Sequence, residues 1–154
     1  MDWAERWNRL ERRSWVALLG AALVLLLAAG AGAQERVDVE VTLVRVSDAP
    51  GGVAKGARAK RYDALLRGQV AYQSLEVVRT EGRKLAPGKL WELELPTGAV
   101  LSLRALDVSE EGTLLSVDLE GSVQGDFKVR RGHPLILGGP PFRDGKLVIG
   151  VETR

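Results

Sequence analysis

The stretch V-D-V-E-V-T-L-V-R-V at residues 37–46 decides the class of fold. Apolar residues occupy every second position from Val37 to Leu43, and polar residues fill the positions between them. An apolar period of two predicts a β-strand with one buried face and one face in water. From Val44 onward the apolar residues fall on the opposite parity. We therefore predict a β-bulge near Leu43 and Val44, which reconciles the two halves of the strand.

One segment after this strand has a helical pattern. Residues 57–67 (ARAKRYDALLR) follow a loop that contains Pro50 and Gly51, and they end before Gly68, which supplies the C-cap. The apolar side chains of this helix share one face: Ala59, Tyr62, Leu65 and Leu66. The basic side chains point elsewhere and are interpreted as a solvated surface: Arg58, Lys60, Arg61 and Arg67.

From residue 69 to the end, apolar runs alternate with turn sequences. Strands are expected at residues 72–80, 90–95, 100–108, 114–119, 123–130, 135–137 and 147–151. Turn sequences such as Ala86-Pro87-Gly88 separate them. Short strands that recur at intervals of about 8–12 residues predict a mainly β fold, either an antiparallel sandwich or a small open barrel. The one short helix is expected to pack against a sheet.

Residues 1–33 differ from the rest of the chain. A segment that contains Arg12 and Arg13 precedes an uncharged apolar run, VALLGAALVLLLAA, at residues 16–29, and Ala31 and Ala33 follow in A-x-A register. This order predicts a signal peptide that is cleaved after Ala33. An uncleaved hydrophobic signal anchor is the alternative, and the paired arginines leave the twin-arginine route open beside the general one. Either way, residues 34–154 are expected to form a single exported domain in the periplasm or cell envelope.

The composition excludes several classes of function. The 154 residues include no cysteine and one histidine, which removes disulfides, zinc ribbons, iron–sulfur clusters and histidine-rich metal sites. The formal net charge of +2 is too balanced for nucleic-acid binding. Phosphate-binding loops and dinucleotide fingerprints are absent from the sequence.

Few residues are candidates for catalysis. His133 is the only candidate base, and the serines at 102, 109, 116 and 122 lack the context of a nucleophile elbow. The carboxylate pairs Glu92/Glu94 and Asp118/Glu120 lie at i, i+2 on the outward face of amphipathic strands, as the wet side of a sheet requires. We therefore assign no catalytic, cofactor-binding or metal-binding residue and expect a protein that is not an enzyme.

The C-terminal part has a distinctive order of residues. R-G-H-P-L-I-L-G-G at residues 131–139 is followed by Pro140-Pro141 and by D-G-K-L-V-I at residues 144–149. This hairpin resembles the closing segment of secretin-type outer-membrane channel domains. The initial V-x-V-x-V strand, the Leu-Leu helix end and the Tyr72-Gln73-Ser74-Leu75 strand resemble small, uncharacterised exported bacterial β-rich proteins. The resemblance implies service near secretion or surface machinery, and it transfers no functional residue.

These observations predict a non-enzymatic exported cell-envelope protein that binds another envelope protein or assists secretion or surface assembly. An edge strand is the expected contact, and residues 37–46 and 146–152 are the candidate edges. The alternative is a periplasmic binding module for a small apolar or lipid ligand, and an enzyme with an unrecognised site is a third, less favoured one. No cofactor and no nucleic acid is expected, and the membrane is contacted only if the N-terminal segment is retained.

Overall fold

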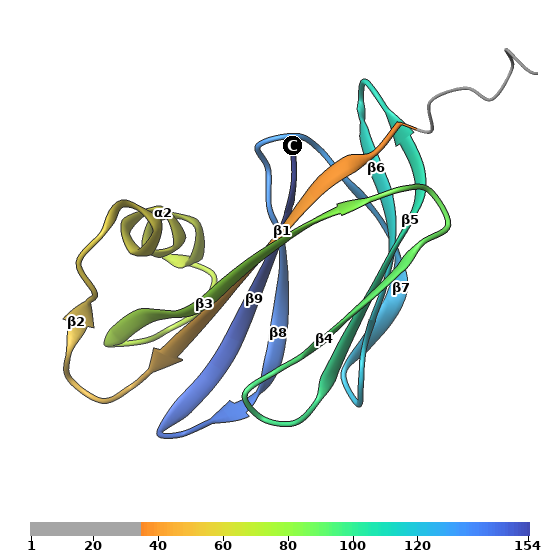
Figure 1. Ribbon diagram of the computed structural model, residues 1–154. Coiled ribbons are helices and arrows are strands. Elements are labelled where there is room, and N and C mark those ends of the chain that lie inside the picture. Colours follow the sequence, from red (N-terminus) through yellow and green to blue (C-terminus); the bar gives the residue numbers. More distant parts are fainter. Residues whose placement is uncertain (1–34) are drawn as a thin grey trace, which may run out of the picture. The chain divides into compact units, whose positions relative to one another are not determined.

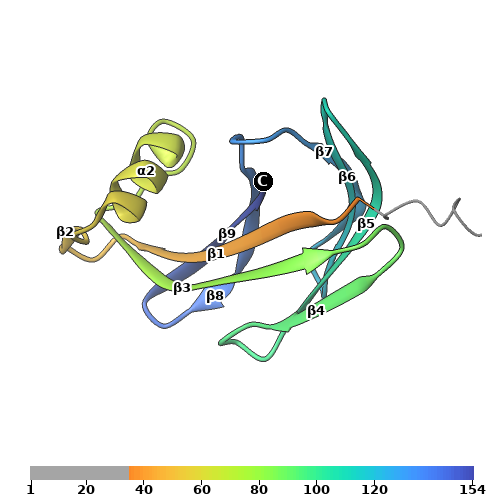
Figure 2. The same cartoon turned by 45° about the horizontal axis from the view of Figure 1, so that its top comes forward.

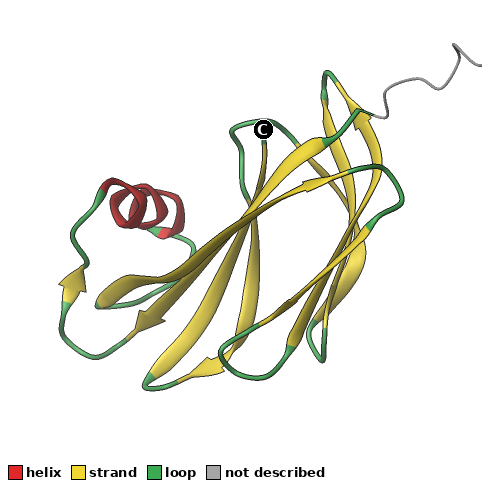
Figure 3. Ribbon diagram, in the orientation of Figure 1, coloured by secondary structure: helices red, strands yellow, loops and turns green. Residues whose placement is uncertain are grey.

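The computed structural model describes residues 35–154, which form one compact unit (Figure 1). The predicted signal segment and its cleavage site lie outside the described residues. Within this unit the chain is mainly strand, with one helix (Figure 3). The elements are β1 (Val37–Ser47), β2 (Gly52–Val53), α2 (Ala57–Leu66), β3 (Ser74–Leu85), β4 (Leu90–Glu94), β5 (Val100–Ser109), β6 (Gly112–Leu119), β7 (Val123–Val129), β8 (Leu135–Phe142) and β9 (Gly145–Thr153).

Two separate sheets confirm the predicted sandwich, and they do not close into a barrel. One sheet has the strand order β2-β3-β1-β9-β8 and the other has the order β4-β5-β6-β7. All pairings are antiparallel except the two-residue contact between β2 and β3. The main core lies between the sheets, and both contribute the apolar side of their amphipathic strands. Its fully buried members include Val41, Leu43, Leu101, Leu103, Leu115, Val117, Ile149 and Val151.

The predicted bulge occurs at the predicted place, but it is not the reason for the change of parity in β1. The pairing of β1 with β3 shifts between Leu43 and Val44, and the unpaired residue is Val78 of β3. The pairing of β1 with β9 continues without a shift. Val44 and Val46 are buried because a different element covers the other face of β1 from this point on. The change of apolar parity in β1 therefore reflects the point at which its other face becomes buried.

The covering element is α2, which packs on the outer face of the five-stranded sheet (Figure 2). Tyr62 and Leu66 of the helix join Val44, Leu75 and Val148 of the sheet in a second core cluster. Leu65, expected on the same face, is half-buried. The helix ends one residue earlier than predicted, so Arg67 and not Gly68 is its C-cap. Gly68 follows with φ +94°, a left-handed conformation that favours glycine just after a helix. No helix among residues 35–154 is long and apolar enough to cross a membrane.

The two strands predicted as sheet edges are interior strands. β1 pairs with both β3 and β9, and β9 pairs with both β1 and β8. The prediction was wrong because the first and last strands of the domain pair with each other across more than one hundred residues of sequence, as at Val41 and Val151. The true edges are β2 and β8 in one sheet and β4 and β7 in the other.

Candidate partner-binding edge

The residues considered for catalysis do not come together. His133 is exposed in the turn between β7 and β8, where its backbone N–H donates to the Arg130 carbonyl at 3.0 Å. The hydroxyls of Ser109 and Ser122 donate to backbone carbonyls, at 3.0 Å and 3.3 Å. Because a nucleophile and its base must lie within hydrogen-bond reach, this arrangement does not favour nucleophilic catalysis.

The paired carboxylates lie on the wet face of the four-stranded sheet. Glu92 and Glu94 are exposed on β4, and Asp118 is exposed on β6. A carboxylate oxygen of Glu120 accepts the backbone N–H of Val100 at 3.3 Å, a structural role at the strand end. Within the described part of the chain, no three His, Asp or Glu side chains are grouped to hold a metal ion.

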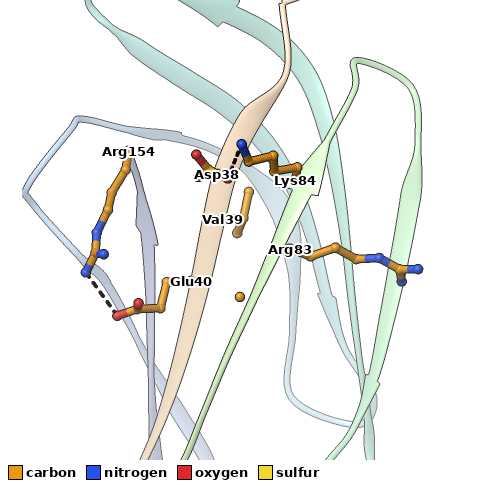
Figure 4. A pocket seen from close by; sticks show the side chains of 7 residues that line it. Asp38, Val39, Glu40, Arg83, Lys84 and Arg154 are labelled. Carbon is orange, nitrogen blue, oxygen red and sulfur yellow. Dashed lines mark hydrogen bonds and ion pairs between the residues drawn. The ribbon is translucent and has the colours of Figure 1, made fainter.

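A charged depression of about 380 Å³ lies on the outer face of β1 and β3 (Figure 4). Its charges are paired within the chain: Arg154 contacts Glu40 at 3.3 Å, and Lys84 lies 3.9 Å from Asp38. Arg83 points away from this group toward the other side of the sheet (Figure 4). Because these charges balance one another, the depression does not select a ligand of either sign.

A second depression, of about 230 Å³, lies at the opposite end of β1 beside Ser47 and Asp144. Arg45 closes this end of the sandwich by pairing with Glu76 at 3.0 Å and with Asp144. Charged residues line most of the first depression, and the second combines Asp48, Asp144 and Lys146 with apolar residues. A lipid site is lined mainly by apolar side chains, so neither depression favours the alternative of a lipid ligand.

Two basic residues of α2 hold the helix on its sheet. Arg61 pairs with Glu152 of β9 at 2.9 Å and donates to the Gly132 carbonyl at 3.2 Å. Arg58 pairs with Glu40 of β1 at 3.0 Å. Glu40 and Glu152 face each other across the two strands, so the arginines also offset their mutual repulsion. Arg58 and Arg61 are exposed, as the interpretation of a solvated surface predicted, and they also pair with carboxylates of the sheet.

Tyr62 packs the helix directly against the backbone of the sheet. Its ring lies against the backbone of Gly150, where an added Cβ would come within 2.6 Å of Tyr62 Cζ. The side chain is 1% exposed, and burial raises the pKa of the phenol, an effect that the nearby Thr42 hydroxyl only partly offsets. Gly150 is therefore required for α2 to dock.

Two of the four sheet edges are poor templates for another strand. β2 has only two residues. β8 contains Pro140 and Pro141, which lack a backbone N–H, and its pairing with β9 is irregular between Gly138 and Pro141. Short length, proline and irregular pairing are the means by which natural sheets protect their edges.

The β4 edge is five residues long, and one of its main-chain carbonyls is engaged by a side chain. Arg79 of β3 donates to the main-chain carbonyl of Glu94, so a side chain from the other sheet reaches the backbone of this edge strand. The inward residues Trp91 and Leu93 are only 5% and 6% exposed. The inward face of β4 is therefore covered, and its Glu94 carbonyl already has a partner within the chain.

Alternate residues of the β7 edge direct their main-chain groups away from the sheet. Glu120 N–H donates to Val100 of β5 at 3.1 Å, so the even-numbered residues at this end of β6 bond to β5 and the odd-numbered ones bond to β7. The β6–β7 pairing joins odd to odd residues without a shift. The N–H and C=O groups of Gln124, Asp126 and Lys128 therefore point away from the sheet, and no strand pairs with them in the described part of the chain.

The apolar side chains along β7 are incompletely covered. The inward-facing Val123 and Phe127 are half-buried, as are Leu135 and Phe142 of the neighbouring β8. Only side-chain hydrogen bonds link the two sheets here, from Ser122 Oγ to the Gly138 carbonyl at 3.3 Å and, in β9, from Thr153 Oγ1 to the Val129 carbonyl at 3.4 Å. The core beneath β7 and β8 therefore keeps several apolar side chains that are only half covered.

No known protein family, curated protein or solved structure matches this chain. The geometry of the chain is therefore the basis for identifying β7 as the candidate binding edge.

Sequence reasoning located β7 as a strand but did not identify it as an edge. Its pattern, V-Q-G-D-F-K-V, already has fewer large apolar residues than the interior strand β6, G-T-L-L-S-V-D-L. Gly125 within the strand is a weak signal, since a strand glycine has no side chain to pack. The decisive information, which strands neighbour β7, depends on the topology.

Proposed function

We propose that this chain is a non-enzymatic exported cell-envelope protein that binds another envelope protein through β7, in the service of secretion or surface assembly. One observation carries the proposal: three successive outward positions of β7 present main-chain donors and acceptors that no strand pairs. Strand addition at a free edge supplies affinity through the main chain and specificity through alternate side chains.

The edge favours a particular kind of partner segment. An extended segment would pair with the main chain of Gln124, Asp126 and Lys128. Its alternate side chains would then lie beside Val123 and Phe127, over the half-buried part of the core. We expect the partner to present a strand with aliphatic residues at every second position.

The proposed location rests on the N-terminal sequence. Cleavage after Ala33 would leave a chain that begins at Gln34, one residue before the compact unit starts at Glu35. All of β1, which starts at Val37, would be kept. N-terminal sequencing of the exported protein is expected to begin at Gln34, and protein that retains Met1 in the membrane fraction would contradict cleavage.

The binding edge is tested by a pair of substitutions at one position. Asp126→Pro removes an outward N–H and leaves the bonds to β6 intact, whereas Asp126→Ala removes the carboxylate and keeps the N–H. Both variants are used, beside the wild type, to capture partners from an envelope extract. We expect Asp126→Pro to lose a partner that Asp126→Ala retains. Equal recovery by the two variants would refute binding through this edge.

A further inference from the structure

The exposed face of β7 carries charges in an order that matches itself. Asp126 and Lys128 are both exposed and are separated by the inward-facing Phe127. A two-fold axis through Phe127 would bring a second copy of β7 alongside in antiparallel order. It would place Asp126 of each copy opposite Lys128 of the other. Opposite charges that face each other across two strands stabilise the pairing.

We propose that, in the absence of its partner, the β7 edge is occupied by the β7 edge of a second copy of this chain, in the register centred on Phe127. The contact is isologous, so it closes as a dimer with two-fold symmetry and does not extend into a filament. The two four-stranded sheets become one continuous sheet across the axis. The dimer covers the main-chain groups that would otherwise remain an unprotected edge.

The main-chain directions allow this register. Asp126 and Lys128 both direct their N–H and C=O groups outward, so the two pairs that they form with the second copy are of the hydrogen-bonded kind. A register centred on Asp126 would instead oppose Asp126 to its own copy, which is repulsive. A register centred on Gly125 would pair Asp126 with the neutral Gln124. Only the Phe127-centred register of these three matches opposite charges.

Lys128 already has a partner within its own chain. Its ammonium lies 2.6 Å from a carboxylate oxygen of Glu111 in the turn between β5 and β6, and this ion pair lowers the pKa of Glu111. The Glu111 side chain is 80% exposed, so the contact holds Lys128 loosely. Lys128 is therefore free to turn toward Asp126 of a second copy.

Charge reversal and its rescue test the dimer. Sedimentation velocity over a wide range of concentrations is measured on protein purified after expression of the full chain. We expect concentration-dependent dimerisation, weakened about tenfold or more by Asp126→Lys, since both charge pairs become repulsive. The double variant Asp126→Lys/Lys128→Asp restores opposite charges and should recover most of the affinity. Added salt should weaken the wild-type dimer.

Control variants separate the interface from the fold. Glu111→Gln removes the in-chain partner of Lys128 without touching the edge, and it should leave the dimer at least as strong. Thermal unfolding shows whether each variant is folded. A folded wild type that stays monomeric throughout, or a double variant no better than Asp126→Lys, would overturn the proposal.

The inference rests on the proposed function only in that self-association and partner binding use the same edge. The variants distinguish self-association from partner binding. Asp126→Lys should lose self-association and keep partner capture, which depends on the main chain. Edge-dependent capture by a protein that never dimerises would refute the dimer alone. A dimer with charge rescue but no edge-dependent capture would refute the proposed function alone.

Discussion

Replacing Gly150 with alanine should dislodge α2. The new Cβ would lie 2.5 Å from Tyr62 Cε1 and 2.6 Å from Cζ, and closer still to the hydroxyl. Carbon atoms in proteins pack at about 3.5–4.0 Å, so the ring must move by about 1 Å. The Tyr62 side chain is 1% exposed and lies between the helix and the sheet, so the ring cannot withdraw without lifting α2.

The expected loss follows from the packing of this contact. Overpacking a buried site costs about 1–3 kcal/mol. For a domain of this size that corresponds to a fall in Tm of about 4–12 °C. Thermal unfolding followed by circular dichroism measures it. The matched control is Gly138→Ala in the neighbouring strand β8, where an added Cβ meets nothing within 4 Å, and it should change the stability by less than about 0.5 kcal/mol.

A double-mutant cycle tests whether Tyr62 is the cause. In a Tyr62→Leu background the ring is gone, so Gly150→Ala should cost less than half of what it costs in the wild type. If Gly150→Ala were as harmless as Gly138→Ala, or equally costly in both backgrounds, the contact between Tyr62 and Gly150 would not be what docks the helix.

The remaining predictions concern the ion pair of α2, the tyrosines and the edge. Arg61→Ala leaves the Glu152 carboxylate, which is 4% exposed, without its partner, and it should lower the free energy of unfolding by about 1–3 kcal/mol in chemical denaturation. Arg67→Ala removes an exposed ion pair with Asp63 within the same helix and should lower it much less. The chain has two tyrosines, and the pKa of each is raised. Burial and the hydrogen bond to Asp63 raise the pKa of Tyr72 to about 12, and burial raises the pKa of Tyr62. Absorbance titration of the folded protein should therefore show little tyrosinate near pH 10, and adding denaturant should increase it. Because both folded values lie above the unfolded value of 10, their stabilisation is complete below pH 10 and is lost as the pH rises toward 12; a midpoint at pH 10 in the folded protein would contradict this. His133→Ala should leave partner capture unchanged, and a loss there would favour a role for this turn.

Local patterns predicted most of the strands. The alternation in β4 and β6 and the glycines of the intervening turns place the boundaries of the four-stranded sheet to within a few residues. Its strands follow one another in space as they do in sequence, β4-β5-β6-β7, so short-range signals suffice. The pairing of β5 with β6 contains one bulge, between Ala105 and Asp107.

The candidate site could not be predicted in the same way. Whether β7 is an edge depends on where β8 goes after its turn, and β8 joins β9 in the other sheet. The pairing of β1 with β9 joins the two ends of the domain and leaves no local trace at Val41 or Val151. The contact of Tyr62 with Gly150 is similarly long-range, and a lone glycine inside a strand signals only that something approaches closely.

Of the four sheet edges within residues 35–154, β7 is the longest that contains no proline. Arg79 engages one carbonyl of the β4 edge, and the half-buried Val123 and Phe127 lie on the inward face of β7. The β7 edge therefore offers a protein ligand seven residues, against five for β4, and its outward main-chain groups pair with no strand within residues 35–154.

Amide hydrogen exchange along β7, resolved by residue and measured on dilute, monomeric protein, tests this claim most directly. The outward amides of Gln124, Asp126 and Lys128 should exchange fast, and those of Gly125 and Phe127, which bond to β6, should exchange slowly. Addition of the captured partner should then protect the outward three. Uniform slow exchange at all five amides in the dilute monomer would show that the edge is already covered and would contradict the account.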